Sequence, residues 1–188
     1  MFIQTESTPN PATLKFLPGE PVMRAGTADF PTREASAHSP LAARIFGVEG
    51  VEGVFLGPDF ITVTKAEAVD WAHMKPGVLG AVLEHYQSGD VVIEGEAKTT
   101  GHAVHEGPDG EVVKQITELL DTRVRPAVAQ DGGDITFHGF DRGVVYLHMQ
   151  GACAGCPSST MTLKMGIENL LRHYIPEVTE VRPVGVQV

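Results

Sequence analysis

The sequence predicts an α+β protein made of two small domains, and three observations lead to this expectation. The chain has 188 residues, which is enough for two small domains. Strand-sized apolar runs alternate with segments of helical periodicity in both halves of the chain. Between them, "EGEAKTTGHAVHEGPD" at 94–109 has no hydrophobic periodicity. We therefore expect domains at 1–93 and 110–188, joined by a solvated linker at 94–109.

The first domain is expected to combine short strands with two helices. Ser39 precedes Pro40, a pair typical of a helix cap followed by the first helical residue. Apolar runs on both sides of Gly57-Pro58-Asp59 predict a hairpin. Pro76 is expected to kink the second helix or to lie near its start. The expected elements are strands at 1–7 and 12–16, a helix from 40, a hairpin at 51–65 and a helix at 70–87.

The second domain is expected to follow the order α-β-β-α-β. Apolar residues recur at helical spacing from Glu111, and Pro126 with "DGGD" ends this helix by about residue 130. The strands are expected at 135–140, 144–149 and 178–184, with a helix at 157–174 between the last two. The side chains of this helix that we expect to face inward are Met161, Met165, Ile167, Leu170 and Leu171.

Composition indicates a soluble globular protein and excludes two classes of partner. The chain is 42% hydrophobic and 20% charged, as ordinary globular proteins are. No apolar run approaches the roughly 18 residues of a membrane-spanning helix. The formal net charge is −10, and no basic cluster offers a surface for a nucleic-acid backbone.

Cysteine content and the N-terminus bear on the compartment. The two cysteines are Cys153 and Cys156, a spacing too short for a stabilising disulfide framework. The N-terminal residues have neither the pattern of a signal peptide nor that of a transit peptide. We therefore expect a reducing, cytoplasmic (bacterial) location, with a processed organellar matrix protein as the alternative.

The segment "GACAGCPSST" at 151–160 places a CxxC pair where a strand meets a helix. Pro157 opens the helix, so Cys156 is expected at its N-cap. There the unpaired N–H groups and the helix dipole favour a thiolate, the form that binds metals or attacks electrophiles. Gly151 and Gly155 let the backbone approach whatever the sulfurs hold.

Several interpretations of Cys153 and Cys156 compete. They could be core residues, or the dithiol of a thioredoxin-like oxidoreductase. They could also bind zinc or an iron–sulfur cluster, both of which usually take four protein ligands. His138 and His148 could complete a zinc site, although both are expected in strands. Alternatively, two chains could share one [4Fe–4S] cluster, or a zinc ion, across a two-fold axis.

Other polar residues are expected to have structural roles. Asp131 and Asp134 flank two glycines, as in a tight turn whose carboxylates accept backbone N–H groups. Lys164 lies in the helix after the CxxC pair and is expected in solvent. His102 and His105 lie in the linker and are expected to be solvated. Without a Ser/His/Asp set, a Walker loop or a GxGxxG pattern, the sequence indicates no enzyme activity of its own.

A long stretch of the second domain resembles a known family. "QDGGDITFHGF" and "GVVYLHMQGACAGCPSSTMTLKMGIENLL" resemble the C-terminal domain of the NifU family, with its pattern DGGD followed by GxCxGCPSSxxTLKxGIE. Residues 1 to about 90, including "FIQTESTPNPATLKFLPG", resemble the N-terminal domain of Nfu-type proteins. The two resemblances cover nearly the whole chain apart from the linker.

The resemblance implies a non-enzymatic carrier or scaffold for iron–sulfur clusters. Cys153 and Cys156 match the ligand positions of the family, which implies a [4Fe–4S] cluster, or a [2Fe–2S] cluster, bridging a homodimer. The implied partners are an upstream cluster-assembly scaffold and apo iron–sulfur client proteins. The N-terminal domain is expected to help recognise clients. No match to the separate cysteine-rich assembly domain of full-length NifU is present, which favours late-stage carriage.

Overall fold

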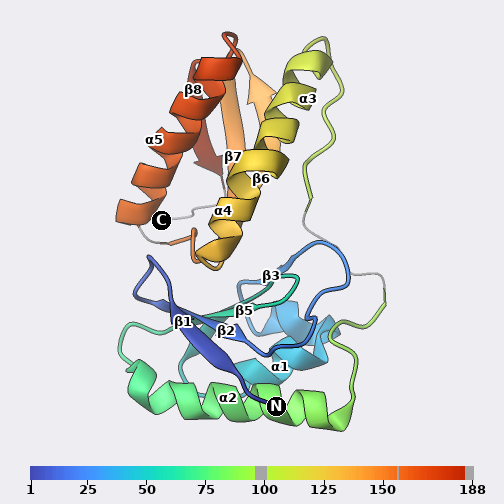
Figure 1. The fold of residues 1–188 in the computed structure, drawn as a ribbon, viewed down its shortest axis with the longest axis vertical. Helices are drawn as coiled ribbons and strands as arrows, with labels where there is room; N and C mark the ends of the chain where they lie inside the picture. Colours follow the sequence, from blue (N-terminus) through green and yellow to red (C-terminus); the bar gives the residue numbers. More distant parts are fainter. Residues whose placement is uncertain (96–100, 156, 185–188) are drawn as a thin grey trace. The chain divides into compact units, whose positions relative to one another are not determined.

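The protein consists of two compact units, 1–100 and 101–188, and each is described by itself (Figure 1). The computed structural model describes all residues except 96–100, 156 and 185–188, and all side chains in the described segments except those of 157–159. Both units combine a β-sheet with helices, so the α+β class is confirmed.

A five-stranded antiparallel sheet forms the centre of the first unit. Its order is β1-β2-β5-β4-β3. Four strands match the sequence prediction, whereas β3 was not predicted from its three-residue length. Gly57 N–H donates to the Phe60 carbonyl at 2.9 Å and closes the expected β4–β5 turn. The strands are β1 (Gln4–Ser7), β2 (Thr13–Leu17), β3 (Ala28–Phe30), β4 (Val51–Leu56) and β5 (Ile61–Lys65).

The helices of the first unit begin at side-chain caps. Helix α1 (Pro40–Phe46) follows the short 3₁₀ helix η1 (Glu34–His38), and the Ser39 hydroxyl accepts the Ala42 N–H at 3.1 Å. Helix α2 (Trp71–Ser88) begins after Asp70, whose carboxylate accepts the Ala72 N–H at 3.1 Å. Both caps satisfy N–H groups that have no partner inside the helix. The cap at Ser39 is therefore confirmed.

One face of this sheet supplies the core of the first unit. The core cluster takes alternate residues of β4 and β5, namely Val54, Leu56, Ile61 and Val63, because successive strand side chains point to opposite faces. Phe55 and Thr62 between them are buried as well, on the other face. Helices α1 and α2 add their own buried residues to the same cluster. Its members include Phe16, Leu41, Ile45, Leu56, Ile61, Val63, Val78 and Val82.

The second unit has the predicted α-β-β-α-β order. Its sheet runs β6-β7-β8, with β6 and β7 antiparallel and β8 parallel to β7. The first helical run consists of α3, a π-helix and α4, and Pro126 lies in the first turn of α4 without ending the run. The elements are α3 (Gly110–Leu119), η2 (Leu120–Val124), α4 (Arg125–Gln130), β6 (Gly133–Asp141), β7 (Val144–Gly151), α5 (Pro157–Tyr174) and β8 (Glu180–Val184).

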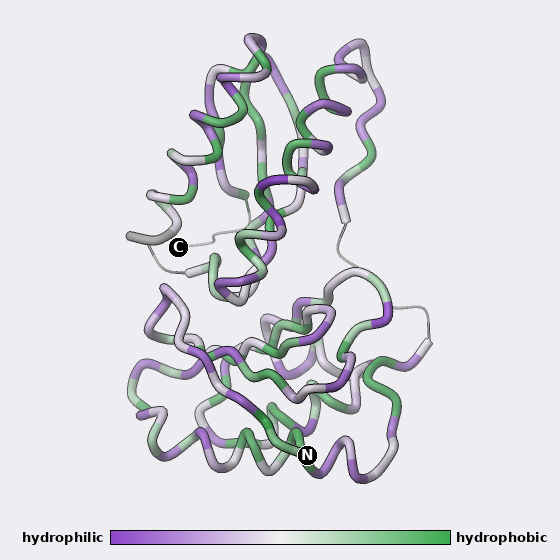
Figure 2. Tube along the Cα trace, in the orientation of Figure 1, coloured by the Kyte–Doolittle hydropathy of each residue, from purple (hydrophilic) through white to green (hydrophobic). Residues whose placement is uncertain are grey.

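The core of the second unit lies between its helices and one face of its sheet. Apolar and polar positions alternate in bands along α3 and α5 (Figure 2). The buried cluster includes Ile116, Leu120, Ile135, Phe137, Leu147, Ile167 and Leu171. Met161 and Met165 are not part of it, since their side chains are 65% and 59% exposed. The expectation that these two methionines face inward is wrong.

The expected linker is packed in part against the second unit. Ala103 N–H donates to the Phe137 carbonyl of β6 at 2.8 Å. Phe137 N–H donates to Nδ1 of His102 at 2.8 Å, and the His105 ring meets the Phe137 ring edge-on. The expectation of a solvated segment is therefore wrong for His102 and His105, whereas residues 101, 103 and 104 are exposed. Residues 96–100 lie outside the described residues.

Candidate functional site

Cys153 lies in a glycine-bounded turn between β7 and α5. Gly151 ends β7 with φ 62° and Gly155 has φ 78°, so both have left-handed backbone conformations that favour glycine. Cys156 lies outside the described residues, as do the side chains of 157–159. The prediction that Cys156 caps α5 stays a prediction.

The Cys153 side chain points inward and packs against the start of β6. It is 6% exposed and belongs to the core cluster of the second unit. A Cβ added to Gly133 would clash with the Cys153 sulfur and with the Gln150 carbonyl oxygen. Only glycine therefore leaves room for the sulfur at this point of the strand. The sequence pattern "DGGD" contains this glycine, but its contact with Cys153 depends on the pairing of Gly133 with Gly151.

Hydrogen bonds hold the turn closed on both sides of Cys153. Ala152 N–H donates to the Gly132 carbonyl at 3.2 Å, and Ala154 N–H donates to the Gly151 carbonyl at 3.1 Å. The Thr160 hydroxyl, on the first turns of α5, donates to the Cys153 carbonyl at 3.0 Å. The turn is thus tied to the loop before β6 and to α5. The sequence analysis did not identify Thr160.

The surroundings of Cys153 favour the neutral thiol. Burial raises the pKa of Cys153 to about 12, and the negative charges of Asp131 and Asp134 act in the same direction. The argument for a stabilised thiolate concerned Cys156 at the helix N-terminus and does not extend to Cys153. In this conformation Cys153 is protonated at neutral pH. It must lose its proton to bind a metal.

The two candidate histidines do not join Cys153. His138 lies exposed in β6, and His148 lies half-buried in β7 opposite Thr136. Burial lowers the pKa of His148, and the charge of His138 adds to the effect. Among the described residues, no three His, Cys, Asp or Glu side chains gather where they could hold a metal ion. Lys164 is half-buried in α5.

Asp134 is more than a turn residue. Its carboxylate accepts the Ile135 N–H at 2.8 Å, as the turn interpretation predicted for such aspartates. However, it also receives two hydrogen bonds from Arg125, both at 2.9 Å. The sequence analysis did not identify Arg125, because nine residues and the end of a helix separate it from Asp134. Asp131 is exposed at the end of α4.

His102 and His105 are not solvated as expected. The His102 side chain is 16% exposed, and its Nε2 lies 2.8 Å from an Asp121 oxygen. Nε2 of His105 is buried without a hydrogen-bond partner. Both side chains lie beside Phe137 of β6. A polar, aperiodic segment gave no sign of this packing, because strand pairing at a sheet edge depends on the partner.

Two family models match the chain, one for each unit. Residues 3–89 match "Scaffold protein Nfu/NifU N terminal", and residues 116–182 match "NifU-like domain". A human protein named "NFU1 iron-sulfur cluster scaffold homolog, mitochondrial" is 52% identical over 98% of this chain and 72% of its own length. The chain belongs to the Nfu/NifU family. The family resemblance that the sequence motifs indicated is thereby confirmed.

Plant members of the Nfu/NifU family are equally similar. "NifU-like protein 4, mitochondrial" from Arabidopsis thaliana is 52% identical over 95% of this chain, which spans 64% of that protein. Among solved structures, a NifU-like protein from Saccharomyces cerevisiae shares 30% identity, with a TM-score of 0.46 over 51% of this chain and 87% of its own.

The relatives correct the expected location. The names of the human and Arabidopsis relatives place those proteins in mitochondria. The prediction of a bacterial cytoplasmic location is therefore wrong, and the comparison points to an organelle. Among the described residues, no helix is both long and apolar enough to cross a membrane.

Proposed function

We propose that this chain is a non-enzymatic carrier that holds an iron–sulfur cluster between two copies of itself and passes it to apo-proteins. Cys153 and Cys156 of each copy would supply the four ligands of one [4Fe–4S] cluster. The observation that carries the proposal is a CxxC pair, with Cys153 in a glycine-bounded turn, in a member of the Nfu/NifU family. The relatives' names as iron–sulfur cluster scaffolds support it.

The donor set fits a cluster shared between copies. Thiolates are the usual protein ligands of iron–sulfur clusters, and this chain contains two cysteines. His138 and His148 do not lie with Cys153 in a metal-binding group of the described residues. A second copy is therefore the simplest source of the two missing ligands.

The burial of Cys153 gives the carrier two states. In the structure this thiol packs on Gly133, and its burial favours the protonated form. Loading requires the turn to open, the proton to leave and the sulfur to face the cluster. When client thiolates displace these ligands stepwise, the turn can close again over Cys153. Reclosure would favour release, because it replaces a metal contact with a packed core position.

The alternative of a dithiol oxidoreductase receives little support from Cys153. An attacking thiol needs a lowered pKa and access to its substrate. Cys153 has a raised pKa and 6% exposure. The alternative would therefore depend on Cys156 alone as the attacking thiol. Cys156 lies outside the described residues.

The mitochondrial names of the relatives support an organellar site of action. Those names describe the relatives as scaffolds, and client proteins with iron–sulfur clusters are the corresponding partners of this chain. An upstream assembly scaffold would supply the cluster. We propose late-stage carriage because the donor set is small and shared, which suits stepwise ligand exchange.

Anaerobic reconstitution with iron and sulfide, followed by native mass spectrometry, tests the proposal. We expect a dimer that carries one cluster of four iron and four sulfide ions. Cys153→Ala and Cys156→Ala should each abolish cluster binding, because either change removes two of the four ligands in the dimer. His138→Gln and His148→Gln are matched controls that should retain the cluster. A wild-type chain that stays free of iron, or a histidine variant that loses the cluster, would contradict the proposal.

A further inference from the structure

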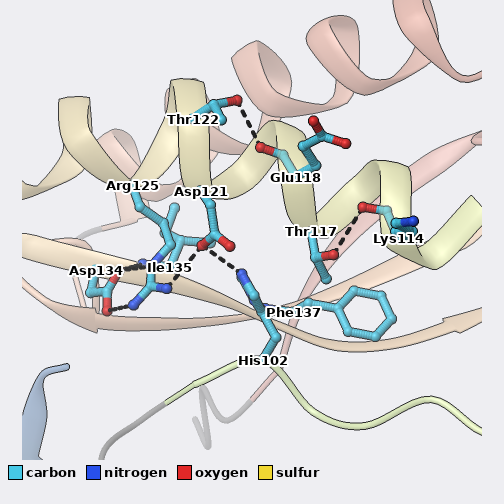
Figure 3. Close-up of polar contacts among 10 residues, drawn as sticks. All are labelled: His102, Lys114, Thr117, Glu118, Asp121, Thr122, Arg125, Asp134, Ile135 and Phe137. Carbon is cyan, nitrogen blue, oxygen red and sulfur yellow. Dashed lines mark hydrogen bonds and ion pairs between the residues drawn. The ribbon is translucent and has the colours of Figure 1, made fainter. Parts of the chain in front are cut away.

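Arg125, the first residue of α4, joins two carboxylates through all three nitrogens of its guanidinium (Figure 3). Its Nε and Nη2 donate to the two oxygens of Asp134, both at 2.9 Å. Its Nη1 donates to Asp121 at 3.0 Å. Two parallel hydrogen bonds from one planar group fix both the distance and the orientation of Asp134. The Asp134 side chain is only 5% exposed, so this contact is shielded from solvent.

Asp134 links Arg125 to Gly133, the residue that packs against Cys153. It is the residue after Gly133, on which the Cys153 sulfur packs. In the sheet, Gly133 pairs with Gly151 and Asp134 pairs with Gln150. Gly133 and Asp134, which the contact with Arg125 holds in place, therefore lie beside the last two residues of β7, just before Cys153. A shift of the Asp134 backbone would move the neighbouring Gly133 away from the thiol.

A second set of contacts holds Arg125 from the other side. An oxygen of Asp121 accepts from Arg125 and from Nε2 of His102, as Figure 3 shows. Nδ1 of His102 accepts the Phe137 N–H, so the proton of the neutral ring lies on Nε2, which donates to Asp121. These contacts run from the segment at 101–105 through η2 and α4 to the start of β6. They leave Arg125 little freedom to turn away from Asp134.

We propose that Arg125 is a positioning residue of the cysteine turn, holding Gly133 against Cys153 so that the thiol stays covered until the cluster is loaded. The consequence for the cluster rests on the function proposed above, whereas the effect on the thiol itself does not. Arg125 touches neither cysteine. It acts through the bidentate contact with Asp134.

A purely structural role must be separated from positioning. Arg125→Gln leaves a buried carboxylate without its charge partner, and this alone would destabilise the unit. In Arg125→Gln/Asp134→Asn that buried charge is also removed, so stability should recover toward the wild-type value. The bidentate contact is still missing. Positioning therefore predicts a stable double variant in which Cys153 is more often uncovered.

The test measures alkylation of Cys153 by iodoacetamide in the metal-free protein, in a Cys156→Ser background, with intact mass as readout. All variants are compared at one pH and well below their unfolding midpoints. Arg172→Gln removes an exposed arginine of α5 and is the matched control for lost positive charge. Asp131→Asn removes the other carboxylate that raises the pKa of Cys153 and controls for electrostatic effects on the thiol.

We expect the double variant to react about tenfold faster than the wild type or more, because the turn opens more often without the bidentate contact. Arg172→Gln should react at the wild-type rate, and Asp131→Asn should stay well below the double variant. If the double variant reacted no faster than Asp131→Asn, Arg125 would only neutralise a buried charge and the proposal would fall. It would fall equally if Arg125→Gln were folded and reacted at the wild-type rate.

The same variants with Cys156 restored connect the result to the cluster. After reconstitution, the double variant should lose its visible absorption to a chelator several times faster than the wild type, since the turn would hold its ligand less firmly. A wild-type chain that bound no cluster would overturn the proposed function, but the alkylation rates would still decide the role of Arg125. Equal chelation rates, beside faster alkylation, would limit that role to the metal-free protein and overturn its extension to the cluster.

Discussion

Cys153, the proposed cluster ligand, is packed in the core of the second unit. A thiol with a pKa near 12 and 6% exposure resists oxidation and alkylation, because both reactions require an accessible thiolate. Packing thus protects this thiol in the free protein. If Cys153 is a ligand as proposed, cluster binding would have to supply enough free energy to remove the proton and to open the turn.

Asp29 provides a residue-scale prediction about stability in the first unit. It lies in β3, opposite Phe55 of β4, and burial raises its pKa to about 6. Above this pH the folded state contains a poorly solvated carboxylate. As the pH falls from about 6 to the unfolded value of 3.8, the folded state takes up the proton first, so stability rises. Asp29→Asn should therefore stabilise the unit at neutral pH.

We expect Asp29→Asn to raise the free energy of unfolding by about 1–2 kcal/mol at pH 7.5, less than the full shift implies because the side chain is partly exposed. At pH 4.5 the gain should be clearly smaller, because Asp29 is then protonated in the folded state, and below the unfolded pKa of 3.8 it should vanish. Urea unfolding followed by Trp71 fluorescence checks this, since the one tryptophan lies in the first unit. Asp59→Asn, at an exposed turn residue, is the matched control. Equal gains at both pH values would contradict the prediction.

Helix α5 shows at the scale of an element how two apolar stripes differ. Its inner stripe is Leu163, Ile167, Leu170 and Leu171, with the i, i+4, i+7, i+8 spacing of a core-facing helix. Met161 and Met165 repeat with the same spacing of four, but they lie about 200° around the helix from Leu163 and Ile167. They point to solvent.

Substitutions in α5 should follow this division. Met161→Gln and Met165→Gln should change the free energy of unfolding by less than about 0.5 kcal/mol, because both side chains are mainly exposed. Ile167→Ala should cost about 2–4 kcal/mol, because the side chain is 3% exposed and its removal leaves a cavity. Urea unfolding followed by circular dichroism compares the three. A methionine variant as destabilised as Ile167→Ala would mean that α5 packs by its other face.

Much of the element order could be predicted because its signals are local. Ser39 and Pro40 predict the start of α1, and turn residues predict the β4–β5 hairpin. The orientation of Met161 could not be predicted, since hydrophobicity alone does not say which of two stripes faces the sheet. Strand β3 also gave no signal, because three residues are too few to show a period.

At the scale of the whole molecule, the two cysteines could be proposed as a site from the sequence. The residues that pack against Cys153 or hold its neighbours in place could not. The CxxC pair is visible as a motif. Gly133 and Thr160 contact Cys153, and Arg125 contacts Asp134, only after the chain has folded. The segment at 101–105 is the clearest case. Its sequence resembles a linker, yet its Ala103 N–H donates to the Phe137 carbonyl of β6, a backbone contact that leaves no side-chain pattern.

This segment leads to a prediction about truncated chains. A chain of residues 94–188 keeps His102 and Ala103, whereas one of residues 110–188 removes both. In the shorter chain the Phe137 N–H and carbonyl lose their contacts with His102 and Ala103, and Asp121 loses His102 but keeps Arg125. We expect its free energy of unfolding to be lower by about 1–3 kcal/mol, the range for a few lost hydrogen bonds at partly buried groups.

Urea unfolding of the two truncated chains, followed by circular dichroism, measures this difference, and reconstitution measures their cluster content. Both should bind the cluster, since each contains Cys153, Cys156 and all the strands of the second unit. His102→Gln in the longer chain is the matched control and should account for part of the loss, because it changes the side-chain contacts and keeps the Ala103 pairing. Equal unfolding midpoints would show that 101–105 contributes no stability. Loss of the cluster from residues 94–188 would show instead that the first unit takes part in binding, against the expected division of labour in which it serves clients.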